Sequence, residues 1–216
     1  MYQTVFSKIN LIIAVMMLIG CSSKQTASHL PYYNQPDFTP LFLSSSQANN
    51  AVPHTIGSFS FTDQHGKLIT DNDVKGKIHI ANFMFTACGS ICPVMTKHLK
   101  LLQQEFGNDT NVVLLSYSVT PWRDSVPKLL AYAEANKIIS PEWHLLTGDK
   151  AAIYTLARKS YFAEEDLGFS RDSSNFLHTE HILLVDRDLR IRGIYNGTLQ
   201  LEAEQLLKDV KELLKE

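Results

Sequence analysis

The chain has 216 residues, of which 44% are hydrophobic and 19% are charged, and this composition is typical of a globular domain. Its formal net charge of −2 provides no basic excess to hold a phosphate backbone, so nucleic acid is not expected as a partner. Its three cysteines are too few for a disulfide framework, so each is interpreted from its own surroundings.

Residues 1–20 are predicted to be an export signal. The segment from Ile9 to Gly20 is apolar except for Asn10, and Lys8 supplies a positive flank. It is shorter than the roughly 20 apolar residues that cross a bilayer, and it has the length of the hydrophobic region of a secretory signal. The mature domain is therefore expected outside the cytoplasm.

Cys21 follows this apolar run directly, in the sequence Leu18-Ile19-Gly20-Cys21. The sequence resembles the bacterial lipobox, in which a cysteine after small residues becomes lipidated and N-terminal. The alternative is a signal peptide followed by an incidental cysteine, but the position of Cys21 at the end of the run favours lipidation. An acylated Cys21 would hold the protein on a membrane of a bacterial envelope, since each buried methylene contributes about 0.8 kcal/mol.

Residues 21–51 are predicted to form a flexible, lipidated tether. The segment is rich in Ser, Asn, Gln and Thr, as in Ser44-Ser45-Ser46-Gln47. Two apolar patches, 30–33 and 37–41, interrupt it and are candidates for contact with the domain or a partner. A partly ordered leader is the simpler interpretation of these patches.

Residues 52–216 are predicted to form one α/β domain in which strands and helices alternate. Hydrophobic patterning predicts strands at 59–62, 67–69, 78–85, 111–118, 143–146, 182–185 and 191–195, and helices at 93–106, 126–136, 150–160 and around 206–214. Alternation of this kind implies crossover connections and a mostly parallel central sheet. A closing hairpin and helix complete a thioredoxin-like fold.

Cys88 and Cys92 lie between a predicted buried strand and the helix that follows it. Ligands in α/β sheets bind at the carboxyl ends of such strands. The positive end of a helix also favours a thiolate over a thiol. A spacing of four residues places both side chains on one face, so the sulfurs can reach one metal ion or each other.

Three interpretations of the pair compete. Two structural cysteines are the least favoured, because the position is a loop at a helix start and not a core stripe. A redox dithiol and a metal site remain. Soft thiolates select Cu(I) and zinc, but a closed zinc site needs four protein ligands and the chain has no second cysteine pair. Copper is therefore the favoured metal.

The segments Phe59–Lys67 and Ala81–Thr96, the second containing Cys-Gly-Ser-Ile-Cys-Pro, resemble the Sco/SenC family. The resemblance runs from about His54 to the C-terminus. It implies a thioredoxin fold, copper held by both cysteines and one histidine, and a role in assembling the binuclear copper centre of cytochrome c oxidase. It also implies thiol-disulfide exchange at the same site, with a Cys88–Cys92 disulfide in the oxidised protein.

The histidine of the family precedes Ser or Thr and a strand that ends in an acidic turn. His178 fits this pattern, and His181, three residues later, is its competitor. In one place the chain departs from the family, because Thr120 stands where an acidic residue usually precedes proline. The later aspartate of the family is matched by Asp124. The departure places in doubt any role of the missing carboxylate in copper transfer or partner docking.

The sequence as a whole predicts a lipid-anchored envelope protein that delivers copper to a membrane oxidase subunit. Its expected site residues are Cys88, Cys92 and His178 for copper, and Cys21 for the lipid. The alternative is a membrane-anchored thiol-disulfide reductase acting on cysteines of a partner, and a copper or redox sensor is a third hypothesis. Three residues separate the cysteines here instead of the two of thioredoxins, which argues against reduction as the sole role.

Overall fold

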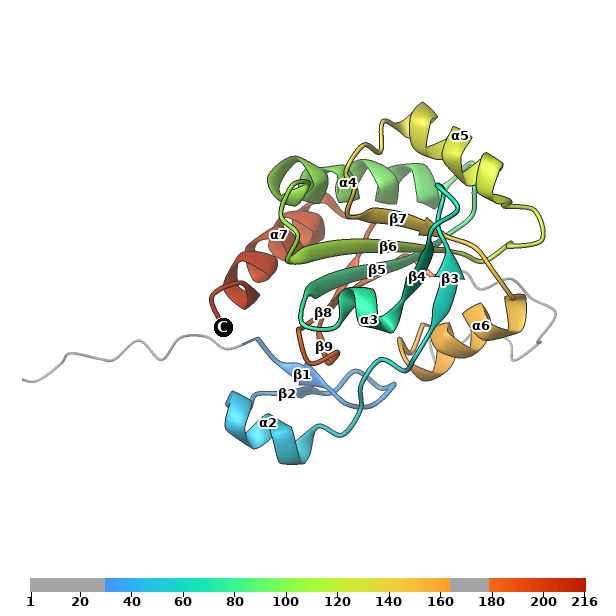
Figure 1. Cartoon of the computed structure of the whole chain (residues 1–216). Coiled ribbons are helices and arrows are strands. Elements are labelled where there is room, and N and C mark those ends of the chain that lie inside the picture. The colour runs from blue at the N-terminus through green and yellow to red at the C-terminus, as the bar shows by residue number, and fades with distance from the viewer. Residues whose placement is uncertain (1–29, 164–178) are drawn as a thin grey trace, which may run out of the picture.

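The computed structural model describes residues 30–163 and 179–216 (Figure 1). Its elements in chain order are β1 (Tyr32–Tyr33), β2 (Pro40–Leu41), α2 (Ser45–Ala51), β3 (Ser60–Thr62), β4 (Leu68–Thr70), α3 (Asp71–Val74), β5 (Ile78–Met84), α4 (Ile91–Phe106), β6 (Val112–Ser118), α5 (Val126–Asn136), β7 (Trp143–Leu146), α6 (Lys150–Lys159), β8 (His181–Val185), β9 (Ile191–Asn196) and α7 (Gln200–Leu213). Every strand and helix predicted between 59 and 214 is present, with ends that differ by a few residues.

The main sheet has the strand order β2-β1-β9-β8-β5-β6-β7, and β3 and β4 form a separate hairpin. Strands β5, β6 and β7 are mutually parallel. The closing hairpin β8–β9 lies antiparallel beside β5, and β1 adds antiparallel to β9. The predicted α/β class is confirmed, but the whole sheet is mixed because parallel pairing is confined to β5, β6 and β7.

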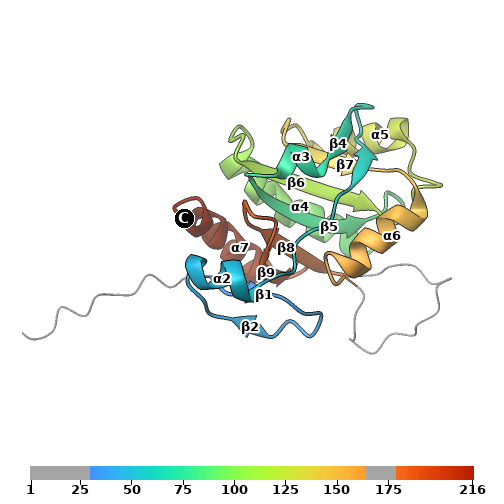
Figure 2. The ribbon, with the colours of Figure 1, turned by 60° about the horizontal axis from the view of Figure 1, so that its bottom comes forward.

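Helices cover both faces of the sheet, which explains why all seven residues of β5 and of β6 are buried. Helices α4, α5 and α7 pack apolar side chains against one face. Helix α6 packs with the β3–β4 hairpin against the other (Figures 1 and 2). The largely apolar segments β5 and β6 are therefore central strands. The turn that follows β5 lies at the edge of the core.

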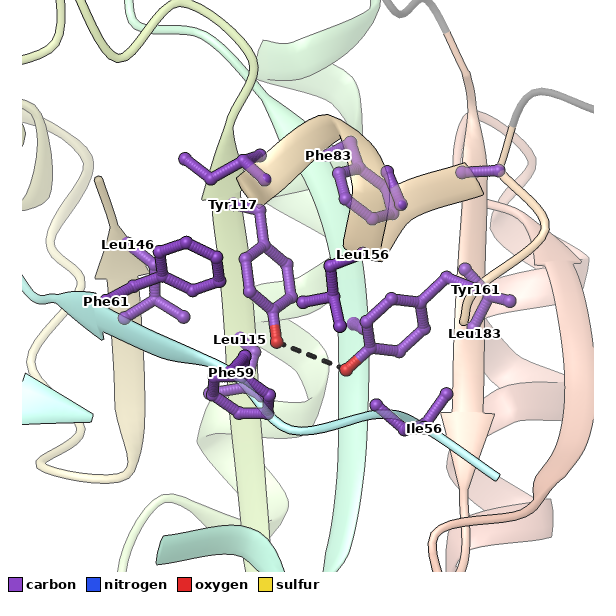
Figure 3. Close-up of a cluster of buried hydrophobic side chains, with 14 of the residues drawn as sticks. Ile56, Phe59, Phe61, Phe83, Leu115, Tyr117, Leu146, Leu156, Tyr161 and Leu183 are labelled. Carbon is purple, nitrogen blue, oxygen red and sulfur yellow. Dashed lines mark hydrogen bonds between the residues drawn. The ribbon is translucent and has the colours of Figure 1, made fainter. Parts of the chain in front are cut away.

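The α6 face of the core is rich in aromatic rings (Figure 3). Tyr117 stacks on Phe83, and its hydroxyl lies 3.1 Å from the hydroxyl of Tyr161. The Tyr161 hydroxyl in turn lies 3.1 Å from Nε2 of His79, whose side chain is fully buried in β5. His79 is thus a core residue, and its burial lowers its pKa to about 3.

Burial of neutral His79 predicts a loss of stability in acid. The unfolded chain gains a proton on this imidazole as the pH falls below about 6.5, whereas the folded protein does not until the pH approaches 3. The free energy of unfolding should therefore fall by up to about 1.4 kcal/mol per pH unit across this window. Urea titrations at pH 7 and pH 4.5 measure the loss, and His79→Phe should show a shallower dependence. An unchanged slope in His79→Phe would contradict the assignment.

The structure places residues 30–51 on the edge of the sheet, where a flexible tether was predicted, and residues 21–29 of that tether lie outside the described residues. Strand β1 pairs with β2 and, at Tyr33, with Ile191 of β9. Helix α2 begins with a capping box, in which Ser44 and Gln47 exchange hydrogen bonds. A small cluster then buries Tyr32 against α2. The polar composition of the segment concealed the local contacts, and the pairing of Tyr33 with Ile191 joins residues more than a hundred positions apart.

Arg192 fastens this segment to the rest of the fold. Its side chain is buried and donates hydrogen bonds to the carbonyl oxygens of Leu30 (2.9 Å) and Pro31 (3.1 Å). It also donates to both carboxylate oxygens of Glu216, at 2.8 and 3.1 Å, and lies over the ring of Tyr32. The start of the described chain and its C-terminus are therefore held side by side (Figure 1).

Candidate metal centre

The two predicted cysteines come together where β5 ends and α4 begins. Cys88 lies in the turn between them and is partly exposed, and its N–H donates to the carbonyl of Phe85 at 3.2 Å. Cys92 lies in the first turn of α4, is only 4% exposed, and its N–H donates to Sγ of Cys88 at 3.4 Å. Pro93 follows in the first helical turn, where its missing N–H has no cost. Both cysteines are free thiols in this structure.

The two thiols have opposite electrostatic environments. Partial burial alone would raise the pKa of Cys88, but the N–H groups of Cys92, Ser90 and Ile91 at the start of α4 outweigh it and lower this pKa. Deep burial, together with the adjacent Cys88 sulfur, raises the pKa of Cys92 to about 12. The thiolate form is therefore favoured more at the partly exposed Cys88 than at the buried Cys92.

This asymmetry predicts selective alkylation of the reduced, metal-free protein. At neutral pH, iodoacetamide should modify Cys88 first, because the thiolate is the reactive form, while Cys92 reacts slowly until the protein is unfolded. Peptide mass spectrometry at timed intervals measures the two rates, and urea-unfolded protein is the control in which they should converge. Equal rates in the folded protein would contradict the asymmetry.

Asp124 holds the cysteine turn in place. Its carboxylate is almost fully buried and accepts hydrogen bonds from the hydroxyls of Thr86 (2.5 Å), Ser118 (2.6 Å) and Thr120 (2.9 Å). Thr86 lies in the turn that carries Cys88, whereas Ser118 ends β6. Thr120, the departure from the family pattern, is thus a buried donor to Asp124. The sequence marked Asp124 as a family match but did not indicate these partners.

Within residues 30–163 and 179–216, no group of three or more His, Cys, Asp or Glu side chains is placed to hold a metal ion. The predicted ligand His178 and the predicted lipidation site Cys21 both lie outside the described residues. Four described histidines are hydrogen-bonded elsewhere in the fold: His54, His79, His98 and His144. The structure therefore brings together Cys88 and Cys92 and leaves the third ligand as a prediction.

The start of β8 lies at the cysteine end of the sheet. Strand β8 runs antiparallel to β5, and Ile182 pairs with Asn82 near the end of β5. His181 begins β8, and its ring packs edge-on against Phe38, with 6.1 Å between the ring centroids. His178 precedes His181 by three residues, and three residues span at most about 10 Å.

Comparison with known proteins matches residues 47–215 to the family described as SCO1/SenC. A SCO1/SenC family lipoprotein from Bacillus anthracis is 28% identical, with a TM-score of 0.65 over 74% of this chain and 95% of that one. BsSco, a member of the Sco family of cytochrome c oxidase assembly proteins with a disulfide switch, is also 28% identical, with a TM-score of 0.63 over 75% and 94%. ScoI of Bradyrhizobium japonicum, solved with copper bound, is 28% identical as well, with a TM-score of 0.58 over 74% and 99%. This chain belongs to the SCO1/SenC family.

Proposed function

We propose that this protein binds copper and delivers it to, or helps to mature, the copper centre of a cytochrome c oxidase. The observation that carries the proposal is the contact between Cys88 and Cys92, which are free thiols of unequal pKa at the carboxyl end of β5. Two soft sulfur ligands in this arrangement suit Cu(I). Two relatives that are each 28% identical to this chain support the proposal. ScoI of B. japonicum was solved with copper bound, and BsSco belongs to a family of cytochrome c oxidase assembly proteins.

The unequal thiols assign a role to each cysteine. Cys88, as the partly exposed cysteine with the lowered pKa, is the first ligand that an incoming copper ion meets. Cys92 sits behind it and loses its proton when the metal binds, so binding should weaken as the pH falls. His178 is the proposed nitrogen ligand. Asp124 keeps the turn rigid through Thr86, so the two sulfurs are held ready for the metal.

Lipidation of Cys21 is the proposed means of membrane attachment. No helix within the described ranges is long and apolar enough to cross a bilayer. The relative from B. anthracis is a lipoprotein, and the run that ends at Cys21 supports the same anchor here. Mass spectrometry of the mature N-terminus tests this assignment. A mature chain that begins at another residue, without lipid, would exclude it.

Copper titration of the reduced and the oxidised protein tests the proposed function. The reduced protein should bind one Cu(I) per chain. The form with a Cys88–Cys92 disulfide should bind little until it is reduced, because its sulfurs are no longer free ligands. Equal uptake by the two forms would exclude a site made by these sulfurs. Measurement of free thiols in the same samples reports the state of the pair.

The same asymmetry favours a second candidate, a thiol-disulfide reductase. The Cys88 thiolate would attack a partner disulfide and form a mixed disulfide, and the Cys92 thiolate would then attack Sγ of Cys88. The two electrons pass from the thiols of this chain to the partner. The partner leaves with two reduced thiols, and this chain is left with a Cys88–Cys92 disulfide. Copper retained through purification distinguishes a carrier from a pure reductase.

A further inference from the structure

A groove runs along α4 away from the cysteine pair. It lies between α4 and the end of α5, has a volume of about 240 Å³, and begins at Pro93, the residue after Cys92. Its other lining residues include Thr96, Lys97 and Lys100 from α4, and Lys137, which follows the last residue of α5. The groove therefore extends over about 10 Å of helix from the copper-binding residues.

The groove is positively charged although the protein as a whole has a net charge of −2. Its lining contains three lysines, Lys97, Lys100 and Lys137, and no carboxylate. Among the described residues none of these lysines forms an ion pair. Glu134 on α5 is exposed beside the groove but does not line it. Three cations around one groove form a local field that attracts an anionic surface.

Two exposed apolar side chains lie on segments next to the cysteine turn, one on α4 and one on the loop that follows β6. Val94 on α4 is 39% exposed and shares a helix face with Lys97. Trp122 is 54% exposed and lies on the loop that Asp124 joins to Thr86, and the ammonium of Lys150 lies 4.8 Å from the centroid of its ring. An apolar centre with a charged border is the usual anatomy of a protein interface, and Trp is enriched among the residues that dominate binding energy.

The mouth of the groove, beside the cysteines, lies at the opposite end of the sheet from the first described residues. The described chain starts at Leu30, whose carbonyl is bonded to Arg192 beside Glu216. Strand β9, which carries Arg192, begins level with the start of β5, because Ile191 pairs with Val185 and Val185 with His79. The cysteines follow the end of β5.

We infer that this groove is the docking site for an acidic segment of the protein that receives copper from Cys88 and Cys92. The inference rests on the proposed function, because it assigns the partner chemistry of the same site. Transfer between thiolate sites requires the two proteins to meet within bonding distance of one ion. Carboxylates of the partner seated along Lys97, Lys100 and Lys137 would steer this encounter and fix its orientation.

The test uses the full chain and, as the probe, the soluble copper-accepting domain of the oxidase subunit from the same organism. The groove variant carries Lys97→Glu, Lys100→Glu and Lys137→Glu. The control variant carries Lys67→Glu, Lys75→Glu and Lys208→Glu, which alter exposed lysines elsewhere and change the net charge equally. Binding of the copper-free proteins and the rate of copper transfer are both measured at low and high salt.

The groove variant should associate with the acceptor about tenfold more slowly at low salt, and the control should change much less. The difference should disappear near 1 M salt, where the screening length is about 3 Å. Equal slowing of both variants, or of neither, would overturn the docking site while leaving copper delivery intact. Binding without copper transfer would overturn the proposed function, but the binding of the two variants would still show whether the acceptor docks at the groove. A wild-type chain that does not bind the acceptor would overturn both.

Anionic vesicles separate a protein partner from a lipid one. The Cys21→Ala chain, which lacks the proposed lipid, is mixed with phosphatidylglycerol vesicles, with and without the three groove substitutions. The proposal expects no difference between the two chains. Binding that only the groove substitutions abolish would assign the groove to a membrane surface and overturn the inference.

Discussion

Cys88→Ser should lose Cu(I) affinity by more than about a hundredfold. Changes to the outer partners of metal ligands already cost about 10–100-fold, and this substitution removes a ligand itself. A hydroxyl is a hard donor and does not replace a thiolate for Cu(I). Because Cys88 is partly exposed and lies in a turn outside the core, the fold should survive the change. Competition with a Cu(I) chelator under nitrogen measures the affinity.

Cys92→Ser should show a similar loss of Cu(I) affinity, but it is a less direct test of the copper site because it should also destabilise the fold. Cys92 is almost fully buried, so a serine there places a hydroxyl in an apolar environment and should destabilise the domain by about 1–3 kcal/mol. Cys21→Ala serves as the control, because it removes a cysteine from outside the proposed site. Retention of wild-type affinity in Cys88→Ser, or an equal loss in Cys21→Ala, would contradict a site built on the Cys88–Cys92 pair.

The sequence predicted the central strands and helices well because their hydrophobic patterns are strong and local. The apolar run from Ile78 and the run from Val112 became β5 and β6, whose residues are all buried. The helical spacing of Met95, Leu99 and Leu102 became the buried face of α4. The direction of each strand was harder to predict, because hydrophobic patterning indicates burial but does not determine which neighbour a strand pairs with.

The N-terminal segment shows what composition cannot predict. Its strand β1 has two residues, and its position depends on Arg192, which lies about 160 residues later in the chain. The Ser44 and Gln47 capping box was a local signal for α2 that the Ser-rich composition concealed.

The same limit applies to the candidate site. The spacing of Cys88 and Cys92 predicted that they would meet, and they do. The unequal environments of their thiols depend on how deeply each is buried, which the spacing does not encode. The hydroxyls around Asp124 come from two separate segments of the chain and meet only in the fold.

His178→Ala should lose Cu(II) binding while retaining much of the Cu(I) affinity. Cu(I) is soft and can be held by two thiolates alone, whereas Cu(II) is harder and prefers an added nitrogen ligand. The variant should therefore lose the stable Cu(II)–thiolate absorption. Titration of the reduced protein with each oxidation state measures both affinities, with oxygen excluded for Cu(I).

His181→Ala is the matched control, because it removes an imidazole three residues away. The ring of His181 packs edge-on against Phe38, and its backbone N–H donates to the hydroxyl of Thr179 at 3.1 Å. Its loss should leave both copper affinities near those of the wild type, with at most a small change in stability. If His181→Ala shows the Cu(II) defect instead, the family match is displaced by three residues and His181 is the ligand. If neither variant shows the defect, the third ligand lies outside this segment, and a site made by two cysteines and one of these histidines is excluded.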